Sequence, residues 1–153
     1  MSNQVASSYR DPRRNVEINV GKVCNNKCVF CLDGMPSKED HTFMPFETMQ
    51  AELRRWRAEG HLSVGFLGGE PTTYPKITEA VGFARELGFT RIALATNAMM
   101  LRREPFLDGL IAAGLTRVTV SMHGHVAELE DRLTMVPGGF EKKRTALRHL
   151  VTR

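Results

Sequence analysis

Three cysteines lie close together near the start of the chain, and they are the only cysteines among its 153 residues. Cys24, Cys28 and Cys31 have the spacing C-x3-C-x2-C. Thiolates are soft ligands that suit iron–sulfur clusters and zinc, and both kinds of centre usually take four protein ligands. Three thiolates on a cubane cluster leave one iron open to a ligand that is not protein. The spacing therefore predicts a metal site, either such an open cluster or a zinc ion completed by a histidine such as His41.

The composition indicates an ordinary globular protein of a reducing compartment. The chain is 42% hydrophobic and 25% charged, with a formal net charge of +4. An odd number of clustered cysteines argues against a disulfide framework. The basic residues are spread along the chain, which favours a solvated surface over a nucleic-acid-binding patch. Without a signal-peptide segment or an apolar run of about 20 residues, we expect a cytoplasmic protein with no membrane segment.

Strands and helices are predicted to alternate along the chain. We expect a flexible tail at residues 1–14 and one domain at residues 15–153. Short apolar strands are predicted at residues 16–20, 64–67, 91–95 and 118–122. Helical periodicity follows each strand, with helices that begin near Pro45, Pro75, Glu104 and Phe140. This order predicts an α/β fold with a parallel sheet and helices outside it.

Polar motifs follow all four predicted strands. The cysteines come after the first strand, Gly68-Gly69-Glu70 after the second, Thr96-Asn97 after the third, and Ser121 and His123 close the fourth. In parallel α/β folds, sites gather at the carboxyl ends of the strands. We therefore expect these motifs to lie together on one edge of the sheet.

The cysteine motif, with Phe30 just before its last cysteine, resembles that of the radical S-adenosylmethionine (radical SAM) superfamily. The resemblance implies that Cys24, Cys28 and Cys31 bind three irons of a [4Fe–4S] cluster. It also implies that the amino and carboxylate groups of S-adenosyl-L-methionine bind the fourth iron. Phe30 would shield the cluster from water, with ordinary core packing as the alternative.

The motifs on the next three strands resemble the same family. Gly68-Gly69-Glu70 matches its GGEP stretch, which implies that these residues orient the methionine end of the cofactor. Glycines allow close backbone approach, and a carboxylate accepts hydrogen bonds from a cationic amino group. Thr96-Asn97 resembles the TNG stretch near the cofactor, with Ala98 in place of the usual glycine, and a plain strand-end turn is the alternative. Ser121 stands where the family places a serine that contacts the ribose or carboxylate.

The resemblance also implies an activity. A reduced cluster passes one electron to the sulfonium of S-adenosylmethionine, and the resulting 5′-deoxyadenosyl radical removes a hydrogen atom from a substrate. It implies a flavodoxin- or ferredoxin-type electron donor and leaves the substrate open, either a peptide or a small molecule. Residues 135–140 resemble a turn in peptide-modifying members of the family. His123 could face a substrate or transfer protons, with a structural role as the alternative.

The family core contains six β/α units, and this chain supplies four. We therefore expect a parallel partial barrel of the radical SAM type that stops after the fourth unit. Two other hypotheses stay open at this point: a catalytically inactive module that binds a cluster or S-adenosylmethionine, and a structural zinc site.

Overall fold

A computed structural model describes residues 15–32 and 42–153 of the chain. The predicted tail at residues 1–14 and the candidate zinc ligand His41 lie outside the described residues.

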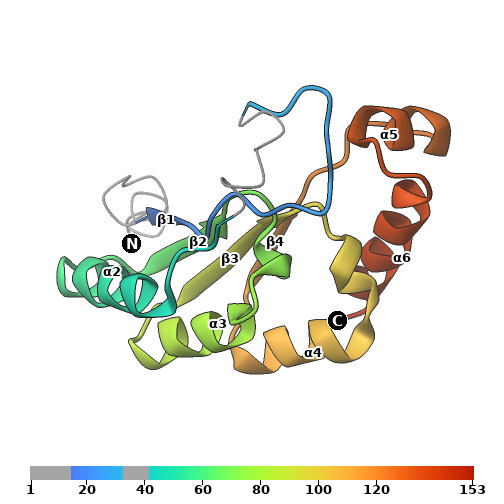
Figure 1. Ribbon diagram of the computed structural model, residues 1–153. Helices are drawn as coiled ribbons and strands as arrows, with labels where there is room; N and C mark the ends of the chain where they lie inside the picture. Colours follow the sequence, from blue (N-terminus) through green and yellow to red (C-terminus); the bar gives the residue numbers. More distant parts are fainter. Residues whose placement is uncertain (1–14, 33–41) are drawn as a thin grey trace, which may run out of the picture.

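Four parallel strands form one sheet in the order of the sequence (Figure 1): β1 (Asn15–Asn19), β2 (Ser63–Leu67), β3 (Arg91–Thr96) and β4 (Arg117–Val120). Side chains alternate between the two faces of a strand, so apolar residues two apart share a face. Ile18, Phe66, Leu94 and Val118 occupy one row across the sheet on the face that packs into the core. The predicted parallel α/β fold is confirmed.

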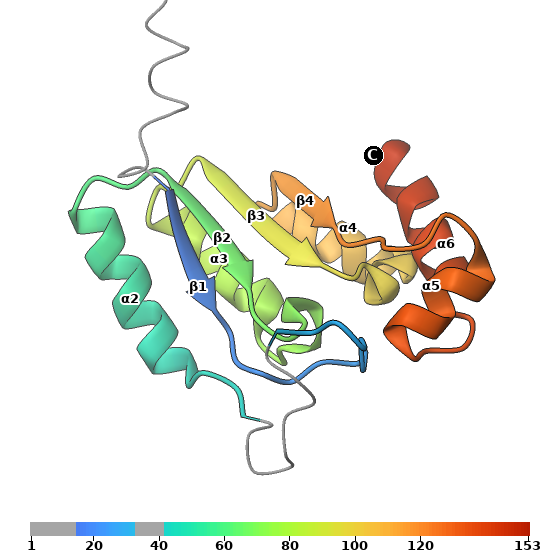
Figure 2. The same cartoon turned by 90° about the horizontal axis from the view of Figure 1, so that it is seen from above.

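Three helices cover the apolar face of the sheet (Figures 1 and 2): α2 (Phe46–Ala58), α3 (Ile77–Glu86) and α4 (Glu104–Ala113). Each presents buried apolar residues to the core, such as Leu53, Val81 and Leu110. Two short 3-10 helices follow β2 and β3: η3 (Pro71–Thr73) and η4 (Met99–Arg102). No helix of the described part of the chain is long and apolar enough to cross a membrane.

Two helices follow β4, where the sequence predicted one. The last helix, α6 (Gly139–Val151), agrees with the prediction, but a further helix, α5 (Ala127–Thr134), precedes it. The buried residues of α5, Glu130 and Thr134, are polar, but Leu129 and Leu133 are four positions apart, a spacing typical of a helix that the sequence interpretation did not use.

The carboxyl ends of the four strands all point to the same edge of the sheet, which we call the rim (Figure 2). Residues 20–32, which we call the cysteine loop, run along this rim after β1 and lie beside α5 (Figures 1 and 2). The predicted gathering of the polar motifs on one edge is therefore confirmed.

Candidate functional site

The two rim glycines lie against the backbone of the cysteine loop. The amide of Gly69 donates to the carbonyl of Gly21, and the amide of Glu70 donates to that of Val23, both at 2.8 Å. A Cβ atom on Gly69 would stand 2.6 Å from the carbonyl oxygen of Lys22, which is closer than real Cβ contacts. Gly68 has a φ of 137°, a conformation that favours glycine. The close approach expected of these glycines is thus made by the chain itself, and it seats the cysteine loop on β2.

Glu70 joins the ends of β2 and β3. It is 1% exposed. Its Oε1 accepts hydrogen bonds from the amide and hydroxyl of Thr72 and from the hydroxyl of Thr96, while Oε2 accepts one from the amide of Asn97 at 2.7 Å. The Thr96 hydroxyl in turn accepts a bond from the amide of Ala98. Thr96 is therefore hydrogen-bonded within the strand-end turn.

Asn97 joins the end of β3 to the cysteine loop. Its Nδ2 donates to Oδ1 of Asn25 at 2.7 Å, and its own Oδ1 accepts from the amide of Met99. The next residue, Ala98, is buried with a φ of 62°, so it adopts the left-handed conformation that the family's glycine adopts readily. The turn therefore forms with alanine in that place.

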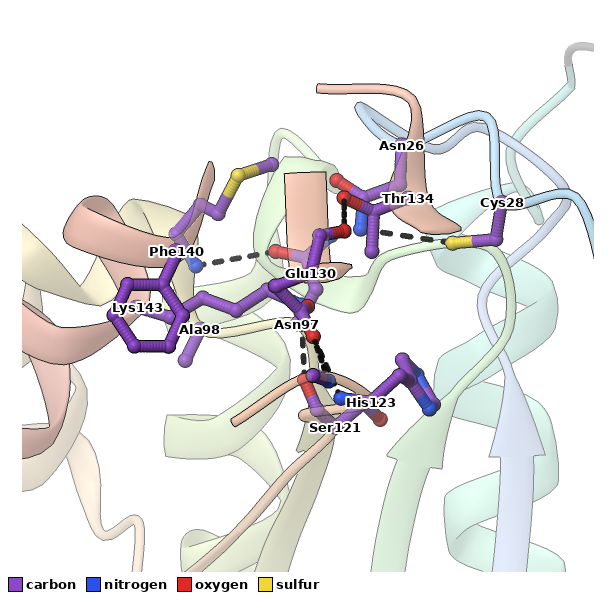
Figure 3. A network of polar contacts seen from close by, with 12 residues as sticks. Asn26, Cys28, Asn97, Ala98, Ser121, His123, Glu130, Thr134, Phe140 and Lys143 are labelled. Carbon is purple, nitrogen blue, oxygen red and sulfur yellow. Dashed lines mark hydrogen bonds and ion pairs between the residues drawn. The ribbon is translucent and has the colours of Figure 1, made fainter. Parts of the chain in front are cut away.

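Asn26 contacts two of the three cysteine sulfurs. Its backbone amide donates to Sγ of Cys24 at 3.4 Å, and its Nδ2 donates to Sγ of Cys28 at 3.8 Å (Figure 3). The amide of Cys31 donates to the carbonyl of Cys28 at 3.1 Å, so the last two cysteines share one turn. All three cysteines are free thiols, and Cys31 is exposed. The loop thus presents its sulfurs at the rim.

The surroundings of Cys24 oppose its ionisation. Burial raises the pKa of the Cys24 thiol, the amide of Asn26 lowers it in part, and the negative charges of Glu70, Cys28 and Cys31 raise it further. A positive group among the three sulfurs would favour their thiolate form.

The described residues contain no group of three or more His, Cys, Asp or Glu side chains arranged to hold one metal ion. A structural zinc ion needs all its ligands at about 2.0–2.3 Å from a single centre. In a cubane cluster each thiolate binds a different iron, so the thiolates need not meet at one point. Three thiols are the donor set of a cubane cluster with one open iron, and a zinc ion in this place would need a further ligand.

Ser121 and His123 lie on the rim after β4. The amide of Ser121 donates to the carbonyl of Thr96 at 2.9 Å, and the residue is exposed. The ring of His123 meets that of Phe30 edge-on, with centroids 4.4 Å apart. Phe30 is 45% exposed, so it is not a core residue, and its contact with His123 joins the cysteine loop to the end of β4.

The sequence interpretation missed a buried ion pair behind this part of the rim. Glu130 and Lys143 are both fully buried and bonded to each other (Figure 3). Burial opposes the charge of Glu130, but Lys143 and the backbone amides of His123 and Gly124 outweigh it, so the pKa of Glu130 is lowered. Glutamate and lysine are common on helix surfaces, and nothing in their spacing distinguishes these two from exposed neighbours.

The model of the Radical SAM superfamily matches residues 18–152 of this chain. The chain belongs to the radical SAM superfamily. The family implies a [4Fe–4S] cluster and S-adenosylmethionine, and the three thiols of the cysteine loop are the donors that such a cluster takes.

Curated relatives within the radical SAM superfamily have different activities. The AdoMet-dependent heme synthase of Methanosarcina barkeri is 31% identical over 78% of this chain and 34% of its own length. The PqqA peptide cyclase of Rhodopseudomonas palustris is 33% identical over 78% of this chain and 31% of its own length. The chain thus spans about a third of the length of these two relatives.

Solved structures agree with the family and the fold. SuiB of Streptococcus suis bound to S-adenosylmethionine is 25% identical, with a TM-score of 0.64 over 85% of this chain and 30% of its own. The same protein bound to its precursor peptide SuiA is 26% identical, with a TM-score of 0.62 over 82% of this chain and 28% of its own.

Proposed function

We propose that residues 15–153 form part of the core of a radical SAM enzyme. Cys24, Cys28 and Cys31 hold a [4Fe–4S] cluster, and S-adenosylmethionine binds beside it on the rim. One observation carries this proposal: the cysteine loop is bonded to the ends of β2 and β3 through Glu70 and Asn97, so the only thiols of the chain lie on the rim with the other motifs.

The rim residues bind and orient the cofactor in this proposal. Gly68-Gly69-Glu70 orients its methionine end. Oε2 of Glu70 accepts one hydrogen bond within the described residues, and a carboxylate oxygen can accept two, which leaves a position for the cationic amino group once the cofactor reaches this buried carboxylate. Thr96-Asn97 lies near the cofactor, Ser121 contacts the ribose or carboxylate, and Phe30 shields the cluster from water. When bound, the cluster and cofactor would supply one-electron cleavage of the sulfonium and removal of hydrogen from a substrate.

We propose a peptide as the first substrate class to test and a flavodoxin- or ferredoxin-type protein as electron donor. The peptide is supported by two similar proteins, the PqqA peptide cyclase and the SuiB that binds SuiA. The turn before α6, which resembles one in peptide-modifying members, is held by Asp131, whose carboxylate accepts the amides of Gly138 and Phe140.

Anaerobic reconstitution of the chain with iron and sulfide tests the proposed function. The chain is reduced with dithionite and mixed with S-adenosylmethionine, and 5′-deoxyadenosine is measured. We expect brown protein with about four irons per chain and production of 5′-deoxyadenosine. Replacement of Cys28 by serine should abolish both, while Ser2→Cys, which restores the thiol count outside the motif, should not rescue them.

Two results would contradict the enzyme proposal for this chain. A cluster without 5′-deoxyadenosine would favour a catalytically inactive binding module. One colourless zinc per chain with no uptake of iron would favour the structural zinc site.

A further inference from the structure

Helix α5 touches the cysteine loop on both sides of Cys28. The carbonyl of Thr134 accepts the amide of Lys27 at 3.1 Å, and the carbonyl of Leu133 accepts the amide of Val29 at 3.0 Å. These are the last residues of α5, whose terminal carbonyls have no partner within the helix. The end of α5 therefore fixes the backbone that carries the middle cysteine.

The same helix also holds the turn after β4. Oε2 of Glu130 accepts the amides of His123 at 2.7 Å and Gly124 at 2.6 Å. A Cβ atom on Gly124 would stand 2.8 Å from Cα of Glu130, so the turn and the helix are in direct contact. Figure 3 shows Glu130 between this turn and Lys143.

Lys143 completes the arrangement from α6. Its Nζ donates to Glu130 and, at 3.0 Å, to the carbonyl of Ser121. Both charged side chains are fully buried, and a buried charge is costly unless it is paired and bonded as these are. The ion pair is therefore hydrogen-bonded to three residues of the rim turn: Lys143 to the carbonyl of Ser121, and Glu130 to the amides of His123 and Gly124.

We infer that Glu130 and Lys143 are positioning residues that set the cysteine loop and the Ser121 turn relative to each other through α5. This inference rests on the proposed function for its consequence, which is the fit of S-adenosylmethionine between the cysteines and Ser121. Its structural content is independent of any cofactor, because the bonds to Lys27 and Val29 exist in the protein alone.

A double variant separates positioning from stability. Replacing a buried ion pair by apolar residues of similar volume often leaves a fold as stable as before. Glu130→Leu with Lys143→Met keeps the core filled but removes every side-chain bond to the rim turn. The matched control is Glu141→Leu with Arg144→Met, which removes an exposed ion pair from α6, the helix that carries Lys143.

Amide exchange in the chain without cofactor is the first measurement. The amides of Lys27 and Val29 show whether loss of the ion pair alters the cysteine loop through α5. Their acceptors are backbone carbonyls of α5, which the double variant leaves in place. We expect them to exchange about tenfold faster in the buried-pair variant, because their hydrogen bonds are weakened, and at the parent rate in the control. Parent-like exchange at both amides in a folded variant would overturn the inference.

Binding of S-adenosylmethionine to the reconstituted protein is the second measurement, followed by the change that it causes in the electron paramagnetic resonance spectrum of the reduced cluster. We expect the buried-pair variant to retain iron but to need about tenfold more S-adenosylmethionine for half of that change, in line with the loss of one positioning contact. Unchanged affinity would overturn the inference. A parent chain that takes up no cluster would instead contradict the proposed function and leave the exchange result to decide this inference.

Glu130→Gln provides the same test if the double variant does not fold. It keeps the shape of the side chain and one acceptor oxygen but loses the charge that holds Lys143. Faster exchange at Lys27 and Val29 supports the inference, and parent rates contradict it.

Discussion

Asn97, at the end of β3, donates a 2.7 Å hydrogen bond from Nδ2 to Oδ1 of Asn25, which lies between the first two cysteines. The two residues are 72 positions apart in the sequence. The bond joins the cysteine loop to the network of Glu70, because the amide of Asn97 also donates to that carboxylate. Placement of the cysteines therefore depends on a residue that binds no metal.

Two isosteric substitutions test this bond. Asn97→Asp removes the Nδ2 donor and places two acceptors face to face, whereas Asn25→Asp keeps an acceptor for Asn97 and adds the same charge. We expect Asn97→Asp to lower the free energy of unfolding by about 1 kcal/mol more than Asn25→Asp does, and to reduce iron uptake. Urea unfolding and iron analysis measure both effects. Equal losses in the two variants would show that charge, and not the bond, is responsible.

Gly69 allows the cysteine loop to lie on β2. Because a Cβ atom there would meet the carbonyl of Lys22 at 2.6 Å, Gly69→Ala should push the loop away. We expect a loss of about 3 kcal/mol in the free energy of unfolding, typical of overpacking against backbone. The control is Gly82→Ala in α3, where a Cβ meets nothing within 4 Å and alanine should stabilise the helix by about 1 kcal/mol. Thermal and urea unfolding measure the stability of both variants. An unchanged free energy of unfolding in Gly69→Ala would contradict the close approach of Gly69 to the cysteine loop.

Glu70 is surrounded by donors, so an amide cannot replace its carboxylate. In Glu70→Gln the side-chain NH2 would face at least one of the groups from Thr72, Thr96 and Asn97 that now donate to Glu70. We expect a loss of about 2 kcal/mol in the free energy of unfolding, since a buried donor is left without an acceptor. Glu79→Gln on the exposed side of α3 should change it by less than about 0.5 kcal/mol. Similar small effects in both variants would mean that Glu70 is not engaged in this way.

Local signals in the sequence were sufficient for the sheet and for the placement of the motifs. The alternation at Val16 and Ile18 and the apolar run from Val64 reflect burial against helices, which a strand's period of two makes visible. Parallel order then places every strand end on one rim, so Cys24 and Glu70 could be expected near each other from the sequence alone.

Contacts between distant polar residues could not be predicted in the same way. Asn25 and Asn97 have no periodicity to mark them, and Glu130 and Lys143 have the composition of a helix surface. Helix α5 was missed because it has only two large apolar residues at helical spacing, Leu129 and Leu133, and its buried residues are polar. These residues are held by hydrogen bonds between segments that are distant in the sequence, and such bonds leave no periodic pattern in the sequence.

Ala98 tests how much the left-handed turn after β3 costs. An alanine in that conformation is strained by about 1 kcal/mol, which Ala98→Gly would relieve. Ala98→Gly also removes a buried methyl group, which costs about 0.8 kcal/mol of stability. Glycine raises the conformational entropy of the unfolded chain, which lowers the free energy of unfolding by a similar amount. We therefore expect Ala98→Gly to change the free energy of unfolding by less than about 1 kcal/mol. Ala98→Val should lower it by about 2 kcal/mol or more, because a β-branched residue tolerates neither the conformation nor the packing.

The buried pair of Glu130 and Lys143 should make stability depend on acid pH. The pKa of Glu130 is lowered in the folded protein, because Lys143 and two backbone amides outweigh the effect of burial. A carboxyl group of this kind contributes stability above its unfolded pKa of about 4.5, and that contribution is lost as the pH falls through the lower folded value. In Glu130→Gln the contribution is absent at every pH.

We therefore expect the parent to be more stable than Glu130→Gln at pH 7 and the difference to shrink steadily below pH of about 4.5. Urea unfolding of both proteins from pH 7 to pH of about 3 measures it, with Glu141→Gln as the exposed control, and a difference that stays constant over this range would contradict a charged Glu130 in the folded protein.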